Sequence, residues 1–148
     1  MSATRSRPLL EILLVDDNLD GLIARRTVLT DLGHHVITTA HPADALGLVE
    51  RTSFDLVVTD YKMPEMDGIE LIRHLRQIRP SVRVILLSAF ADLLPWSESS
   101  TGADAVIQKN AGEVTVLART IDRLFNPKSA RKPAGTLPPA KRARSRPA

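Results

Sequence analysis

Short apolar runs alternate with amphipathic stretches along most of the chain. Five runs have the length of β-strands and are rich in Val, Ile and Leu: residues 9–15, 35–39, 55–59, 82–87 and 104–108. Three of these runs are almost continuously apolar, which is typical of parallel strands that are covered by helices on both faces.

The stretches between and after these runs predict the helices. Apolar residues recur at helical spacing in residues 20–32, 42–51, 67–78 and 114–125. Residues 91–102 leave room for a short helix only, because Pro95 and the sequence SESSTG interrupt them. Five strands that alternate with about five helices predict a single α/β domain, a flavodoxin-like, doubly wound parallel sheet of strand order 2-1-3-4-5.

The charge of the chain is unevenly distributed. Of the 20 Lys and Arg residues, seven lie in residues 126–148, which contain no Asp or Glu, so this segment carries +7 and residues 1–125 carry −4. The segment is also rich in Pro and nearly free of large apolar residues, so it cannot bury enough surface to fold. We therefore predict a disordered arm over residues 1–8, a folded domain over residues 9–125 and a disordered basic tail over residues 126–148.

Composition excludes several classes of protein. The chain has no Cys, so disulfides and thiolate metal sites are impossible. No apolar stretch approaches the roughly 20 residues of a membrane span, and the first apolar run is too short for a signal peptide. We therefore expect a cytoplasmic protein without a membrane partner.

Chemically active side chains come directly after four of the five runs. Asp16 and Asp17 follow the first run, Asp60 the third, Ser88 the fourth and Lys109 the fifth. Ligands of such sheets bind at the carboxyl ends of the strands. Because the first and third strands are neighbours in the predicted order, the three Asp residues should meet at this edge. No glycine-rich phosphate loop is present, which argues against a nucleotide site.

Three adjacent carboxylates need a cation, because like charges raise one another's pKa. Oxygen ligands of this kind suit Mg²⁺, whereas the lack of Cys and the positions of the His residues argue against zinc. Lys109 adds a positive charge and Ser88 a hydroxyl donor. These are the groups that stabilise a phosphoryl group during transfer.

The four strand-end elements resemble the receiver domains of bacterial two-component response regulators, in particular stand-alone, CheY-like receivers. The matching segments are LLVDDN, VVTDYKMPEMDG, ILLSA and VIQKN, in this order, within residues 9 to about 125. The most specific of them is residues 60–68, which read D-x-x-M-P-x-x-D-G. Each element alone has an ordinary explanation, such as a turn or a helix cap, but all four would have to coincide.

The resemblance implies a role for each site residue. Asp60 would accept a phosphoryl group from a histidine kinase or a phosphotransfer protein. Asp17, Asp60 and the backbone carbonyl of Lys62 would bind Mg²⁺, and Asp16 would act through water. Ser88 and Lys109 would then contact the phosphoryl group.

Output in this family is a change of surface around the fourth helix and the fifth strand, which an unidentified downstream protein would recognise. Such a chain promotes only its own phosphorylation and dephosphorylation and is not an enzyme in the usual sense. Trp96 either anchors a partner on this surface or simply covers the core.

The chain departs from the family pattern at several positions. Asn110 follows Lys109 where the family usually has Pro, and Val106 stands where it usually has an aromatic switch residue. Lys62 and Phe90 occupy the positions that flank the phosphoryl group and tune its lifetime. A long cation and an aromatic ring there would obstruct attacking water, so we expect slow loss of the phosphoryl group.

Three alternatives remain open at this point. The departures are compatible with a degenerate receiver that binds a partner without phosphorylation. The basic tail could bind nucleic acid or another acidic surface through counterion release, or it could be a solvated extension. A Mg²⁺-dependent phosphatase would need a second acid two residues after Asp60, where this chain has Lys62.

Overall fold

The computed structural model describes residues 8–89 and 98–126. The compact unit that holds the sheet comprises Leu9–Leu117 and is described here by itself. The last helix begins within this unit and continues beyond it.

The sheet has the predicted topology. Its five strands pair in parallel in the order β2-β1-β3-β4-β5. Each strand begins and ends within two residues of its predicted run: β1 Glu11–Val15, β2 His35–Thr39, β3 Leu56–Asp60, β4 Arg83–Ser88 and β5 Ala105–Gln108. The predicted fold class and strand order are therefore confirmed.

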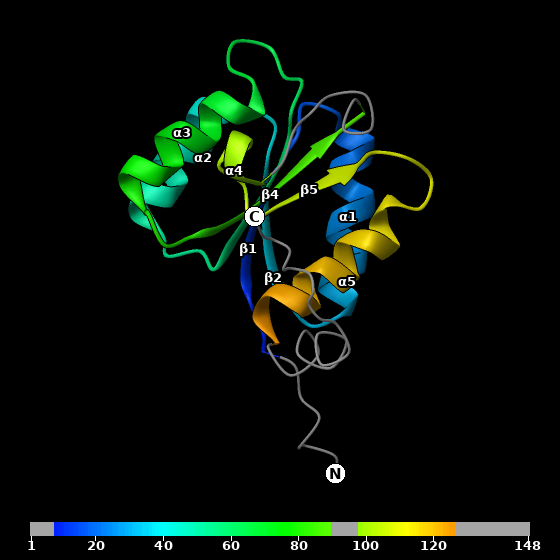
Figure 1. Ribbon diagram of the computed structural model, residues 1–148. Helices are drawn as coiled ribbons and strands as arrows, with labels where there is room; N and C mark the ends of the chain where they lie inside the picture. The colour runs from blue at the N-terminus through cyan, green and yellow to red at the C-terminus, as the bar shows by residue number, and fades with distance from the viewer. Residues whose placement is uncertain (1–7, 90–97, 127–148) are drawn as a thin grey trace, which may run out of the picture. The chain divides into compact units, whose positions relative to one another are not determined.

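Five helices are assigned within the described residues: α1 Leu19–Asp31, α2 Pro42–Arg51, α3 Gly68–Ile78, α4 Glu98–Thr101 and α5 Glu113–Phe125. The four-residue α4 agrees with the expectation of a short helix in this region. Figure 1 shows α2, α3 and α4 on one side of the sheet, and α1 with the start of α5 on the other.

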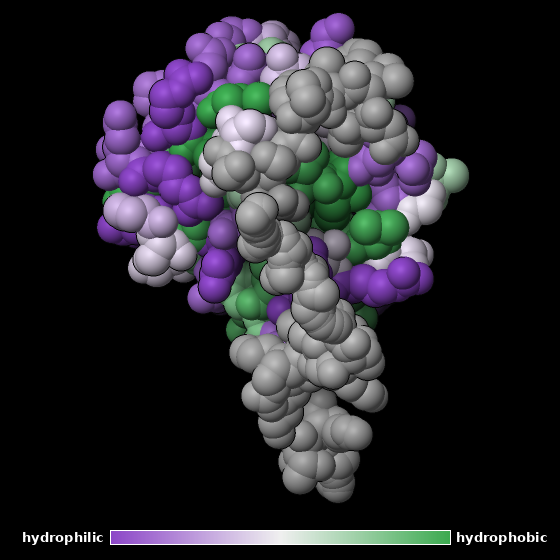
Figure 2. Space-filling model, viewed as in Figure 1, coloured by the Kyte–Doolittle hydropathy of each residue, from purple (hydrophilic) through white to green (hydrophobic). Residues whose placement is uncertain are grey.

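Local sequence explains where the two helices nearest the site begin. The side chain of Asn18 accepts a hydrogen bond from the backbone N–H of Gly21 and caps α1. Asp67 caps α3 in a reciprocal arrangement with Glu70, in which each side chain accepts from the other residue's backbone N–H. The outward face of α3 is mainly hydrophilic, as the purple surface over it shows (Figure 2).

The core lies between the sheet and the helices. Residues of β1, β3 and β4 are almost entirely buried on both faces, as expected for central parallel strands. On the face that α2 and α3 cover, one cluster joins the sheet to both helices, with Leu13, Val57 and Leu86 from strands, Val49 from α2 and Leu71 from α3. This cluster fixes the strand ends that carry the candidate site.

The buried face of α1 includes a charged residue. Ile23 is 63% exposed, whereas Arg25 is only 5% exposed and lies on the buried face with Leu22 and Leu29. The spacing of residues 22, 25 and 29 places them on one side of a helix. A charged side chain therefore points toward the sheet at a position where an apolar residue would be usual.

Among the residues that the structure describes, no helix is both long and apolar enough to cross a membrane.

Candidate functional site

Three carboxylates meet at the carboxyl ends of neighbouring strands. Asp60 is the last residue of β3, and Asp16 and Asp17 come directly after β1, which pairs with β3. One carboxylate oxygen of each residue lies within 4.8 Å of the others. Asp16 and Asp60 are buried and Asp17 is exposed, so the cluster has a buried floor and an open side. The structure thus brings together the three Asp residues expected from the sequence.

Lys109, directly after β5, joins this cluster. Its Nζ atom lies 3.0 Å from Oδ1 of Asp60 and 3.4 Å from Oδ2 of Asp16. The backbone N–H of Lys109 donates to the carbonyl oxygen of Ser88 at 2.9 Å, which fixes the start of the loop after β5 against the end of β4. The cation is therefore held between the two buried carboxylates.

A second cation, not expected from the sequence, reaches the same cluster from α1. Arg25 donates from Nη1 to Oδ2 of Asp16 at 2.8 Å. It also donates to both carboxylate oxygens of Glu113, at the start of α5, through Nε and through Nη2, the latter at 3.3 Å. The side chains of all three residues are at least nine-tenths buried. The helical spacing of Arg25 with the buried residues Leu22 and Leu29 is compatible with an inward position, but it does not indicate the partner Glu113.

The charges around Asp60 oppose one another. Two effects raise the pKa of the Asp60 carboxyl. The larger is its burial, and the smaller is the negative charge of Asp16. The hydrogen bond and charge of Lys109, and the charge of Arg25, act to lower the pKa of Asp60, but the net direction is upward. Ionised Asp60 therefore lowers the free energy of unfolding, and shifted pKa values of this kind are common in functional sites.

The pKa of Arg25 is also shifted. Burial acts to lower it, but the hydrogen bonds and charges of Glu113 and Asp16 outweigh burial, so the pKa of Arg25 is raised. The guanidinium is therefore protonated at neutral pH.

Asp60→Asn is expected to stabilise the metal-free protein at neutral pH. Because the pKa of the Asp60 carboxyl is raised on folding, its contribution to stability is present below the unfolded pKa and is lost as pH rises through the folded pKa. Removing the titrating group should therefore raise the free energy of unfolding near pH 7, and the gain should shrink toward about pH 4. Urea unfolding with chelator at several pH values measures this, and a gain that does not vary with pH would contradict it.

Several residues of the motif from Asp60 to Gly68 have a structural role. Met63 is buried in the core, Glu65 has a positive φ of 74° and Asp67 caps α3. A Cβ atom at Gly68 would lie only 2.4 Å from the backbone oxygen of Asp60, and the N–H of Gly68 donates to the carbonyl of Tyr61 at 2.7 Å. The start of α3 therefore packs directly against the end of β3, which only Gly permits.

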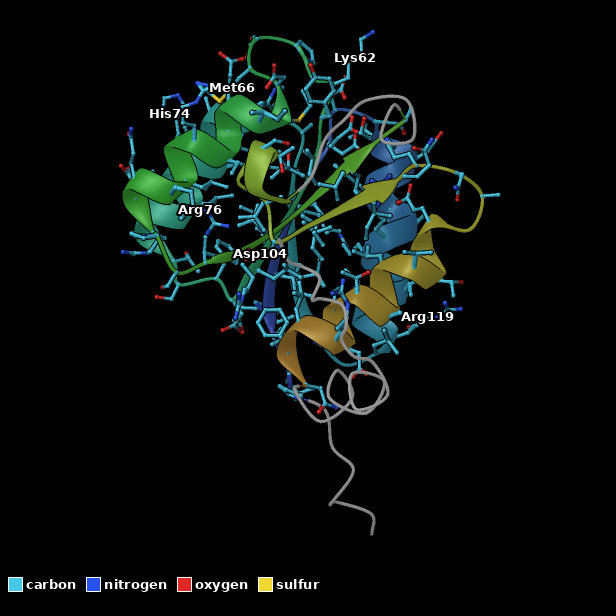
Figure 3. The ribbon with its side chains drawn as sticks, in the orientation of Figure 1. Lys62, Met66, His74, Arg76, Asp104 and Arg119 are labelled. Atoms are coloured by element: carbon cyan, nitrogen blue, oxygen red, sulfur yellow. The ribbon has the colours of Figure 1, made fainter. Side chains whose placement is uncertain are left out.

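The remaining candidate residues differ in their surroundings. Ser88 is buried at the end of β4, at the same edge of the sheet as Asp60. Lys62 is exposed in the loop after β3, and its side chain points away from the rest of the protein (Figure 3). Val106 is partly buried in β5 and packs against the core. Phe90 and Trp96 lie outside the described residues.

Asn110 forms a turn at the place where the family usually has Pro. Its side-chain oxygen accepts from the N–H of Gly112 at 2.9 Å, and its carbonyl accepts from the N–H of Glu113 at 3.1 Å. The turn leads directly into α5 and places Glu113 opposite Arg25.

The donor set fits a hard divalent cation. The three Asp residues offer carboxylate oxygens, which Mg²⁺ prefers. Asp16 is already engaged at both oxygens, because Oδ1 accepts from the N–H of Asn18 at 2.9 Å and Oδ2 accepts from Arg25 and Lys109. Asp16 is therefore better placed to reach a metal through water than to bind it directly.

Comparison with known proteins shows the class of protein that this fold and site define. The profile of the response regulator receiver domain matches residues 12–121. The chain is 32% identical over 112 residues to sporulation initiation phosphotransferase F of Bacillus subtilis, covering 76% of this chain and 83% of that protein. It is 30% identical over 114 residues to the response regulator receiver protein CpdR of Brucella abortus, covering 77% and 95%. The chain belongs to the response regulator receiver domain family of two-component systems.

Other relatives are much longer. The chain is 36% identical over 118 residues to the gliding motility regulatory protein of Myxococcus xanthus, covering 78% of this chain but 15% of that protein. It spans 23% of the transcriptional regulatory protein GlrR of Escherichia coli.

Solved structures agree with the assignment. A CheY-like receiver domain protein of Methanospirillum hungatei matches with a TM-score of 0.72 and 27% identity, over 84% of this chain and 99% of that one. The response regulator TrrA of Thermotoga maritima, in complex with Mg²⁺-BeF, matches with a TM-score of 0.69 and 25% identity, over 77% and 97%. The receiver domain of a sensor histidine kinase of Pseudomonas aeruginosa, with magnesium in its active-site cleft, matches with 0.69 and 26%, over 80% and 98%.

Proposed function

We propose that this protein is a phosphoacceptor in a two-component phosphorelay, and that Asp60 receives the phosphoryl group from a histidine kinase or a phosphotransfer protein. The observation that carries the proposal is the arrangement around Asp60. Its buried carboxylate lies within 4.8 Å of those of Asp16 and Asp17, and Nζ of Lys109 lies 3.0 Å from its Oδ1 atom. One edge of the sheet thus combines a nucleophile, an acidic cation site and a fixed positive charge.

The transfer proceeds by in-line displacement. A carboxylate oxygen of Asp60 attacks phosphorus, and the new P–O bond forms as the P–N bond to the donor's phosphohistidine breaks. The bonding electrons leave with the imidazole nitrogen, which takes up a proton. Lys109 stays paired with the acceptor and offsets the charge on the phosphoryl oxygens.

Asp17, Asp60 and the backbone carbonyl of Lys62 would hold Mg²⁺, with Asp16 acting through water. When bound, the ion supplies positive charge that brings the donor phosphate to the acidic site and stabilises its developing charge. Ser88, buried at the end of β4, would donate a hydrogen bond to the phosphoryl group after transfer.

The output is a phosphorylation-dependent contact with a downstream protein through the surface around α4 and β5. Val106 of β5 and Trp96, which lies outside the described residues, are the candidates from the sequence for this role. Because Val106 packs against the core and is not aromatic, the usual aromatic switch cannot operate in its common form. Lys62 and Phe90 would slow the loss of the phosphoryl group. We retain residues 9–125 as the receiver domain, with residues 1–8 as an arm and residues 126–148 as a basic tail.

The test is the intact mass of the protein after incubation with Mg²⁺ and a small-molecule phosphodonor. We expect one phosphoryl adduct that disappears with a chelator and in Asp60→Asn. Asp44→Asn, which removes an exposed carboxylate at the start of α2, should retain the adduct. This control separates loss of the acceptor from a general loss of negative charge.

A folded protein that forms no adduct with Mg²⁺ would contradict the proposal. It would favour a degenerate receiver that binds its partner without phosphorylation. An adduct that persists in Asp60→Asn would instead place the acceptor at another residue.

A further inference from the structure

Arg25 lies outside the roles that the proposed function assigns. It is the one Arg within the described residues that contacts the acidic cluster, and its side chain is only 6% exposed. It comes from α1, whereas its anion partner Glu113 comes from the start of α5. A guanidinium buried between two elements, with carboxylates on both sides, is costly unless it is fully paired.

Arg25 donates hydrogen bonds to two carboxylates, those of Glu113 and Asp16. Glu113 receives two hydrogen bonds from it, and Asp16 receives one through Oδ2. The strength of the contact with Asp16 therefore depends on how much of the guanidinium charge Glu113 offsets. Four carboxylates and two cations share the site, which leaves a net charge of −2 when all are ionised.

Asp16 has two further contacts that hold its carboxylate. Oδ1 of Asp16 accepts from the backbone N–H of Asn18, and Lys109 contacts Oδ2 at 3.4 Å. The main effect of Arg25 on the acidic cluster is therefore electrostatic. A fixed positive charge beside a carboxylate of the cluster opposes the binding of a second cation there.

We propose that Arg25, itself held by Glu113, is a positioning residue that sets the Mg²⁺ affinity of the pocket by acting as an internal counterion of Asp16. This proposal rests on the Mg²⁺ site of the proposed function. The positive charge of the guanidinium beside Asp16 opposes the binding of Mg²⁺. The negative charge of Glu113 offsets part of the guanidinium charge and so reduces this opposition. The affinity of the pocket is thus adjusted by a residue pair that does not touch the metal.

Two variants should change the affinity in opposite directions. Glu113→Gln leaves the charge of Arg25 directed at Asp16 and should weaken Mg²⁺ binding by about threefold or more. The double variant Arg25→Met, Glu113→Met removes the nearer cation together with the farther anion and should tighten binding by a similar factor. The double variant leaves no buried charge of the pair unpaired, so it should fold.

Isothermal titration calorimetry of the full chain with MgCl₂ at constant ionic strength measures these affinities, and urea unfolding measures stability alongside. Asp17→Asn should abolish the binding and so reports on the pocket itself. Arg76→Met is the matched control for stability, because Arg76 pairs with Asp104 near the amino end of β4 and donates to nearby backbone carbonyls (Figure 3). It should lower stability without changing Mg²⁺ affinity.

The inference is overturned if Glu113→Gln and the double variant both bind Mg²⁺ like the wild type, or if both affinities fall together with stability. A wild type that binds Mg²⁺ no better than Asp17→Asn would overturn the proposed metal site as well. The two failures are therefore distinguishable in one series of titrations.

Discussion

Arg25→Met alone is expected to lower the free energy of unfolding by about 3–5 kcal/mol. The substitution leaves Glu113 buried, at 6% exposure, without its guanidinium partner, and it removes one of the two cations that contact Asp16. Uncompensated buried charge is among the most destabilising changes that one substitution can make. Urea unfolding near neutral pH measures the loss.

The double variant Arg25→Met, Glu113→Met separates the loss of a charge partner from the loss of packing. It replaces the buried pair by apolar side chains of similar length, so most of the lost stability should return. A single variant as stable as the wild type would contradict the account of Arg25 as the buried partner of Glu113. A double variant no more stable than the single would show that packing, and not charge, holds α1 at this position.

Gly68→Ala is expected to lower the free energy of unfolding by about 3 kcal/mol. The added Cβ would lie 2.4 Å from the backbone oxygen of Asp60 and 2.8 Å from the side chain of Leu86. Because the closest atom belongs to the backbone, the start of α3 must move away from the end of β3. The movement also displaces Asp60, so phosphoryl transfer should slow. Urea unfolding and the initial rate of adduct formation measure the two effects.

Gly47→Ala is the matched control. Gly47 lies within α2, and a Cβ atom there would meet only the far end of the flexible Arg51 side chain at 3.2 Å. Ala is a better helix former than Gly by up to about 1 kcal/mol, so this variant should be slightly more stable than the wild type. If both variants were equally destabilised, the close approach of α3 to β3 would not explain the effect at Gly68.

The sheet and its strand ends could be predicted from the sequence because two simple patterns define them. Apolar runs of strand length locate the strands, and parallel strands present their carboxyl ends at one edge. These patterns predict that Asp16, Asp17 and Asp60 lie together with Lys109 near them, as the structure shows.

The role of Arg25 could not be predicted in the same way, because the apolar residues of α1 indicate more than one buried face. Leu22 and Leu29 are buried, but Ile23 is exposed, and the sequence alone does not decide between these faces. Only the contact between α1 and the start of α5, where Glu113 lies, determines that Arg25 points inward. Pairing between residues so far apart in the sequence leaves no local pattern.

The most direct test of the central claim is to locate the phosphoryl group within the chain. Borohydride reduces an aspartyl phosphate to homoserine, which remains after digestion with trypsin. Residues 52–62 form one tryptic peptide that contains Asp55 and Asp60, so Asp55 is an internal control. After treatment with Mg²⁺ and a phosphodonor, we expect homoserine at position 60 and unchanged Asp55, with nothing reduced in the chelator control. Homoserine at another position, with Asp60 unchanged in the phosphorylated protein, would contradict the assignment of Asp60 as the phosphoacceptor.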